Sequence, residues 1–309
     1  MGGAGNSDDT NKTAPIAIYL LLIILLPLFG LLFGAQPKSA PRLGNLHMLG
    51  RLPHRALTKL AQKYGPIMPL RLGHVPTIVV SSPRAAELFL KQYDAVFASP
   101  PIFQASRYMS YGAKGIGFTP YGDFWRRARR MCTLHLLTPA KGLRTAEIEV
   151  AVRRLVEASV AREVVDVGER VGELVEGIVF KMLVGKRMEE DKRYDWKGIV
   201  REGVALAGAF NFADFVPYLA PLDLQGLTRK MKAVSKVADE MVENIIEDYL
   251  KGEDFGQQRD IVGTMLAMMV NPNSEFFSTF DRENVKAIML DLFVAGIDTS
   301  LQTNGHSRR

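Results

Sequence analysis

The chain has 309 residues, enough for one large hydrophobic core or two modest ones. Hydrophobic residues make up 47% and charged residues 23%, as in ordinary globular proteins, so we do not expect disorder for the bulk of the chain. The net charge is +6, but basic and acidic residues alternate and no nucleic-acid-binding spacing accompanies them, so we expect no nucleic-acid partner.

The first predicted element is a membrane anchor. Residues 16–33 carry no charge, and as a helix they would span about 27 Å, close to the hydrocarbon thickness of a bilayer. A cleaved signal peptide is the alternative. It is disfavoured because its apolar region would be shorter and because no positive region precedes this one.

Basic residues follow this apolar segment instead of preceding it. By the positive-inside rule, the remainder of the chain is therefore cytoplasmic. The predicted organisation is a lumenal N-terminus at residues 1–13, a single-pass anchor at residues 14–36 and a linker at residues 37–50.

A small β element is predicted near the start of the main domain. Residues 56–64 have a helical pattern that ends at a Gly-Pro pair. Two β-rich runs, residues 67–72 and 76–80, then flank Gly73 and His74. This arrangement predicts a hairpin in which Gly73 supplies the turn.

The rest of the chain has the three- and four-residue apolar spacing of helices. The predicted helices are residues 142–160, 168–183, 195–209, 227–250, 260–269 and 281–299. The result is one mainly α domain, residues 51–300, followed by a polar tail at residues 301–309.

A first candidate site lies in the segment that contains Trp125 and Arg129. These residues are four apart, so on a helix they share one face. An indole N–H and a guanidinium on one face suit a carboxylate or another anionic group of a flat ligand. The alternative is a basic surface helix with a half-buried tryptophan, and the residues alone favour that alternative.

A second candidate site lies near the end of the last predicted helix. Ala295 and Gly296 leave room beside this helix, and Asp298 and Thr299 could relay protons to a bound molecule. The alternative is that Asp298, Thr299 and Ser300 form an ordinary polar helix end.

Together these segments resemble the cytochrome P-450 family, specifically the large plant group that includes flavonoid hydroxylases. The resemblance is carried by GNLHMLG (44–50), KYGPIM (63–68), LRLG (70–73), FASPP (97–101), FTPYGDFWRRARR (118–130), ADFVPYL (213–219), LDLQGL (222–227) and AGIDTS (295–300). The WxxxR and AGxDT patterns are the specific ones. The resemblance implies the N-terminal part of a mainly α cytochrome P-450 fold, with a small β-sheet near the start and an N-terminal transmembrane helix.

The resemblance also implies which residues contact the cofactor, haem b. Trp125 and Arg129 match the positions that contact the haem propionates. Ala295 and Gly296 match the positions that lie against the oxygen-binding face of the haem. We therefore expect these four residues to bind the cofactor.

The implied reaction is hydroxylation of a small hydrophobic or phenolic plant metabolite, using dioxygen and electrons from NADPH through a reductase. Asp298 and Thr299 match the catalytic pair that delivers protons during oxygen activation. The positions that match the substrate pocket are Phe118, Thr119, Phe210 and Phe212. The resemblance places the protein in the endoplasmic reticulum membrane.

The chain also departs from the family pattern. The family's iron ligand is a cysteine in a Gly-rich loop downstream of the AGxDT segment. That loop is absent from this sequence, whose single cysteine, Cys132, rules out an internal disulfide and is expected to be a small core residue. We therefore predict no metal ligand in this chain, and the polar tail suggests truncation or an altered reading frame.

Two other functions stay open at this stage. One is a non-catalytic, membrane-bound fragment without haem. The other is a membrane-tethered helical interaction protein, which is weaker because it leaves both candidate sites unexplained. For a truncated chain we also expect the apolar face at residues 290–294 to be exposed.

Overall fold

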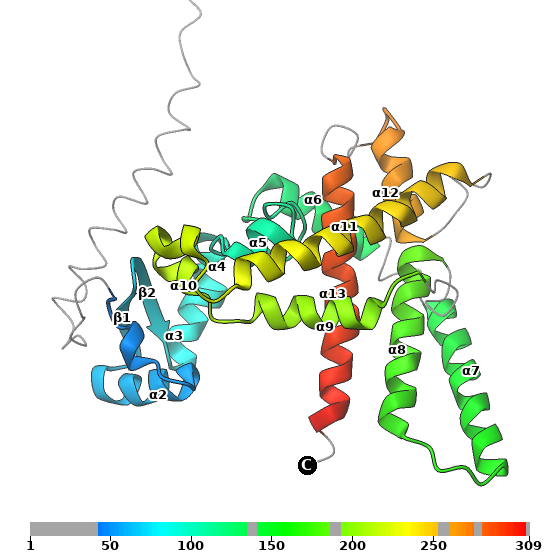
Figure 1. Cartoon of the computed structure of the whole chain (residues 1–309), viewed down its shortest axis with the longest axis horizontal. Helices are drawn as coiled ribbons and strands as arrows, with labels where there is room; N and C mark the ends of the chain where they lie inside the picture. The colour runs from blue at the N-terminus through cyan, green and yellow to red at the C-terminus, as the bar shows by residue number, and fades with distance from the viewer. Residues whose placement is uncertain (1–42, 135–140, 186–192, 253–259, 275–279, 307–309) are drawn as a thin grey trace, which may run out of the picture. The chain divides into compact units, whose positions relative to one another are not determined.

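The computed structural model describes residues 43–134, 141–185, 193–252, 260–274 and 280–306 (Figure 1). The predicted lumenal segment and anchor, residues 1–36, lie outside these ranges, as do residues 37–42 of the predicted linker. Among the described helices, none is both long and apolar enough to cross a membrane. The chain divides into two compact units, Met1–Phe97 with Phe212–Pro221, and Ala98–Asn211 with Leu222–Arg309.

The first unit is built around an antiparallel hairpin. Its elements are η1 (Leu46–Met48), α2 (Pro53–Tyr64), β1 (Ile67–Leu72), β2 (Val75–Val80), α3 (Pro83–Glu87), the π-helical turn η2 (Leu88–Gln92), α4 (Asp94–Phe97), α10 (Phe212–Phe215) and all but the last residue of η5 (Pro217–Leu222). Ile67 pairs with Val80 and Leu72 with Val75, which confirms the predicted hairpin.

Gly73 is required at the hairpin turn for two reasons. Its φ of +61° is a left-handed conformation that side chains disfavour. A Cβ at this position would also lie 2.2 Å from the carbonyl oxygen of Phe215, at the end of α10. The same carbonyl accepts a hydrogen bond from the backbone N–H of His74 at 2.8 Å, so the turn and α10 hold each other in place.

The second unit is helical in its described parts. Its elements are α5 (Gln104–Met109), α6 (Asp123–Cys132), α7 (Lys141–Val160), α8 (Val167–Val184), α9 (Trp196–Ala207), α11 (Leu227–Lys251), α12 (Ile261–Val270) and α13 (Arg282–His306). The predicted mainly α architecture is therefore confirmed. Aspartate side chains cap three of these helices, with Asp166 accepting from Glu169 N, Asp195 from Gly198 N and Asp260 from Gly263 N.

Helix α13 is the central helix of this unit and contacts α8, α9, α11 and α12. Its inward residues, among them Val285, Ile288 and Met289, are fully buried. Phe293 packs its ring against Phe180 and Trp196 at centroid distances of 5.0 and 4.9 Å. These aromatic rings of α8, α9 and α13 form the centre of the core.

Two sequence expectations about α13 are corrected. The helix does not end at residue 299, because its backbone continues through the Asp-Thr-Ser segment to His306. No proline interrupts these residues, so polarity alone does not end the helix. The apolar face at residues 290–294 is not simply exposed either. Phe293 is fully buried by α8 and α9, and its apolar neighbours Leu290, Leu292 and Val294 are half-buried against the core.

Candidate cofactor-contact site

The segment before α6 is a loop, residues 110–122, that is held by hydrogen bonds between its own residues. Ala113 has a φ of +70° and follows Gly112, whose φ is +71°, so the chain reverses direction here. The buried hydroxyl of Thr119 lies 2.5 Å from the carbonyl oxygen of Ala113 and 2.6 Å from that of Gly115, and closes the loop by donating to them. Thr119 thus has a structural role, in addition to the substrate contact expected from the sequence.

The carboxylate of Asp291, on α13, is seated in the same loop. Its Oδ2 atom accepts hydrogen bonds from the backbone N–H groups of Ile116 at 2.6 Å and Gly117 at 2.9 Å. A Cβ on Gly115 would lie 2.1 Å from this oxygen, so only glycine fits beside it. Burial raises the pKa of Asp291, and the two backbone hydrogen bonds offset that rise only in part.

Trp125 and Arg129 lie on one face of α6, as predicted. The indole Nε1–H of Trp125 donates to the carbonyl oxygen of Ile116 at 3.2 Å. The Arg129 guanidinium lies over the Trp125 ring, 5.0 Å from its centroid. Trp125 is half-buried and Arg129 is exposed. The indole is therefore held against the protein while the arginine faces outward.

This pair borders an open, basic hollow of about 410 Å³. The hollow is lined by Trp125, Arg126, Arg129, Arg130, Thr133 and Leu134. Three guanidinium groups at one place fit an anionic ligand, because planar guanidinium donors match carboxylate geometry. The donor set is therefore compatible with the carboxylate of a haem propionate.

Cys132 does not provide a metal ligand at this site. Its side chain is buried in the core, as predicted. Burial, and to a lesser extent the charge of Asp291, raises the pKa of its thiol to about 12, so the thiol stays protonated at neutral pH. In the described parts of the chain, no group of three or more His, Cys, Asp or Glu residues could hold a metal ion.

The small-residue pair of α13 has two different environments. A Cβ on Gly296 would lie 2.7 Å from the Cγ2 atom of Val179, so this glycine allows close packing of α8 against α13. Ala295 is exposed. The backbone of Asp298 and Thr299 is helical, but their side chains lie outside the described part of the structure. Contact of Ala295 and Gly296 with a haem and the catalytic role of Asp298 and Thr299 both stay predictions.

The positions predicted for the substrate pocket are distributed over both compact units. Phe118 is half-buried on the loop beside Gly117. Phe210, which is 43% exposed, belongs to the second unit, and its carbonyl oxygen accepts from Gln225 Nε2 at 2.8 Å. Phe212, which is 40% exposed, begins α10 in the first unit. Their role in substrate binding also stays a prediction.

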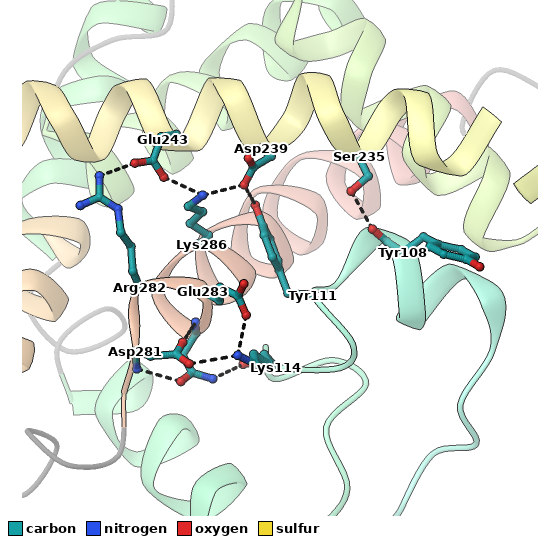
Figure 2. Close-up of polar contacts among 11 residues, drawn as sticks. Tyr108, Tyr111, Lys114, Ser235, Asp239, Glu243, Asp281, Arg282, Glu283 and Lys286 are labelled. Carbon is teal, nitrogen blue, oxygen red and sulfur yellow. Dashed lines mark hydrogen bonds and ion pairs between the residues drawn. The ribbon is translucent and has the colours of Figure 1, made fainter. Parts of the chain in front are cut away.

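A polar network holds the same loop against α11 and α13 (Figure 2). Lys286 of α13 contacts Asp239 Oδ1 and Glu243 Oε2 of α11, both at 2.6 Å. The Tyr111 hydroxyl donates to Asp239 Oδ1 at 2.6 Å, and burial together with this bond raises the pKa of Tyr111. Lys114 binds Asp281 at 3.0 Å and also binds Glu283. The loop is thus attached to two helices.

Sequence reasoning missed Asp291, because residues 290–294 were read as an apolar face. The available signal was an acid inside an otherwise apolar run, Leu290 to Phe293. A charged residue in such a run is rarely buried unless a partner satisfies it. The sequence does not show that the partner is a backbone loop 175 positions away.

Comparison with known proteins defines the class. The family model Cytochrome P-450 matches residues 35–304, so the chain belongs to the cytochrome P-450 family.

Three similar proteins come from plants. Cytochrome P-450 CYP736A12 of Panax ginseng is 49% identical over 85% of this chain and 54% of its own length. Indole-2-monooxygenase of Zea mays is 36% identical over 97% of this chain and 54% of its own. Flavonoid 3'-monooxygenase of Petunia hybrida is 34% identical over 86% and 54%. The chain thus spans about half the length of the curated relatives it matches.

Proposed function

We propose that this chain is part of a haem-dependent monooxygenase that hydroxylates a small hydrophobic or phenolic plant metabolite. Family membership and the outward-facing Arg129, stacked on Trp125 at the basic hollow, support this proposal. Two relatives are named as monooxygenases, one for a flavonoid and one for indole, so a planar aromatic substrate is the class to test first.

The proposal assigns a role to each of the predicted site residues. Haem supplies the oxygen-activating chemistry when it is bound. Arg129 holds a propionate carboxylate, and Trp125 keeps the guanidinium in place by stacking. Asp298 and Thr299 pass protons toward the reaction site. The residues proposed for substrate contact are Phe118, Thr119, Phe210 and Phe212.

The proposal includes a cellular setting. Residues 14–36 anchor the protein in the endoplasmic reticulum membrane as a single span, with the catalytic part in the cytoplasm. An NADPH-dependent cytochrome reductase supplies the electrons. The apolar, uncharged run at residues 16–33 and the basic residues after it support this topology.

The propionate assignment is tested by haemin binding to the detergent-solubilised chain. Replacing Arg129 with alanine should weaken haemin binding about tenfold or more, because a charge-assisted hydrogen bond is lost. Arg201→Ala on α9 is the matched control, since Arg201 is also exposed but lies outside the hollow. Equal haemin affinity for the two variants would contradict the assignment.

The monooxygenase reaction needs a second test, on the complete reading frame. The full protein, co-expressed with a plant reductase, should give a thiolate-type Soret band with carbon monoxide and should hydroxylate members of a flavonoid and indole panel. Absence of both the band and the products would refute the proposal.

A second candidate, a non-catalytic haem-free fragment, is favoured by the state of Cys132. Its buried, protonated thiol is unsuited to ligate iron. The 309-residue chain itself should therefore show no thiolate-type Soret band after reduction with carbon monoxide. A clear band from this chain would exclude the fragment hypothesis.

A further inference from the structure

We propose that Asp291 is a positioning residue, whose carboxylate sets the orientation of Trp125 and of the stacked Arg129 through a single backbone peptide group. Any effect of Asp291 on haem affinity rests on the proposed function, in which Arg129 binds a propionate. The orientation itself follows from contacts in the second compact unit.

The key observation is that one planar peptide group connects α13 to α6. The Gly117 N–H and the Ile116 carbonyl belong to the same peptide unit. The N–H donates to Asp291 at 2.9 Å, and the carbonyl accepts from Trp125 Nε1 at 3.2 Å. Because the peptide group is rigid and planar, fixing one end fixes the direction of the other. Asp291 therefore determines where the indole binds.

The carboxylate is also fitted closely to its place. The Ile116 N–H donates to the same Oδ2 atom at 2.6 Å, so the loop presents two donors to one oxygen. A Cβ on Gly115 would approach that oxygen to 2.1 Å, and one on Gly117 would lie 3.5 Å from Oδ1. The first contact is impossible and the second is ordinary packing, so the loop encloses the carboxylate tightly on the Gly115 side.

The arginine is the last member of the chain of contacts. Its guanidinium lies 5.0 Å from the Trp125 ring centroid, so a change in the indole direction changes where Arg129 points. The surface contacts of the loop differ in this respect. The Lys114 ammonium pairs with Asp281 and Glu283, as Figure 2 shows, and these ion pairs do not involve the 116–117 peptide. These ion pairs hold the loop on α13, whereas the orientation of the 116–117 peptide is set by Asp291.

The test uses the indole N–H signals of the detergent-solubilised, ¹⁵N-labelled chain. The sequence has two tryptophans, and Trp196→Phe assigns their signals. Asp291→Asn should shift the Trp125 signal and speed its hydrogen exchange about tenfold or more, because a neutral amide oxygen accepts from the two N–H groups more weakly than a carboxylate does. The ring centroid of Trp196, on α9, lies 4.9 Å from that of Phe293, which is on α13 like Asp291. The Trp196 signal therefore reports whether α13 remains folded.

Glu283→Gln is the matched control, because it also removes a negative charge from α13 and a contact with the loop. It should leave both indole signals unchanged. If Asp291→Asn also leaves Trp125 unchanged, the proposal is overturned.

A second variant covers the case in which Asp291→Asn moves both tryptophan signals. Gly115→Ala displaces the carboxylate without removing its charge, and should move Trp125 alone. If Gly115→Ala moves neither signal or both, the proposal is again overturned.

Haemin titration separates this inference from the proposed function. If Asp291→Asn moves Trp125 while Arg129→Ala leaves haemin affinity unchanged, the positioning role stands and the propionate assignment fails. If Arg129→Ala weakens haemin binding while Asp291→Asn leaves Trp125 in place, the assignment stands and the positioning role fails.

Discussion

Replacing Phe293 with alanine should destabilise the second unit strongly. The ring is fully buried and lies 5.0 Å from Phe180 and 4.9 Å from Trp196, so its removal leaves a cavity between α8, α9 and α13. Replacing a buried core phenylalanine with alanine lowers the unfolding free energy by about 3–5 kcal/mol. The aromatic contacts make the upper part of that range the expected value, because each adds about 0.5–1.5 kcal/mol beyond area burial.

The assay is chemical unfolding of the solubilised chain, followed by tryptophan fluorescence. The matched control is Phe210→Ala, which removes the same ring from a site that is 43% exposed and should cost about 0.5 kcal/mol or less. A loss for Phe293→Ala no larger than for Phe210→Ala would refute the view that the three-ring cluster is the centre of the core.

Three further predictions concern charge and protonation. Lys286→Met should lower the unfolding free energy by about 1–2 kcal/mol, because Asp239 loses a partner at 2.6 Å. The control is Lys236→Met, whose side chain is 81% exposed, and it should cost about 0.5 kcal/mol or less in the same denaturant titration. Cys132 should resist iodoacetamide in the native chain and react after denaturation, and rapid native labelling would contradict its burial. The folded-state pKa of Asp291 is raised, so its contribution to stability is present below the ordinary aspartate pKa and lost as pH rises through the folded value. The stability of the native chain relative to Asp291→Asn should therefore increase as pH falls from neutral to about 4, and a flat difference would refute the assigned burial.

Local patterns predicted much of this molecule. The hairpin around Gly73 and the shared face of Trp125 and Arg129 depend on residues two to four positions apart, so turn chemistry and helical spacing suffice to find them. The cap residue Asp260 likewise lies directly before the helix it begins.

Contacts between distant segments could not be predicted in this way. The pairing of Asp291 with Ile116 and Gly117 arises only when α13 packs beside the loop before α6. The close approach of Gly296 to Val179 likewise arises only when α8 packs against α13. A period in the sequence identifies which face of a helix is apolar, but it does not identify the neighbour that covers that face.

The different surroundings of Ala295 and Gly296 have a consequence for protein engineering. Position 296 tolerates no side chain beyond hydrogen while Val179 stays in place, so any larger residue there must displace Val179 of α8. Position 295 is exposed in this chain, and larger residues there leave the packing of α8 on α13 intact. Diversity introduced at 295 should therefore affect folding less than diversity introduced at 296.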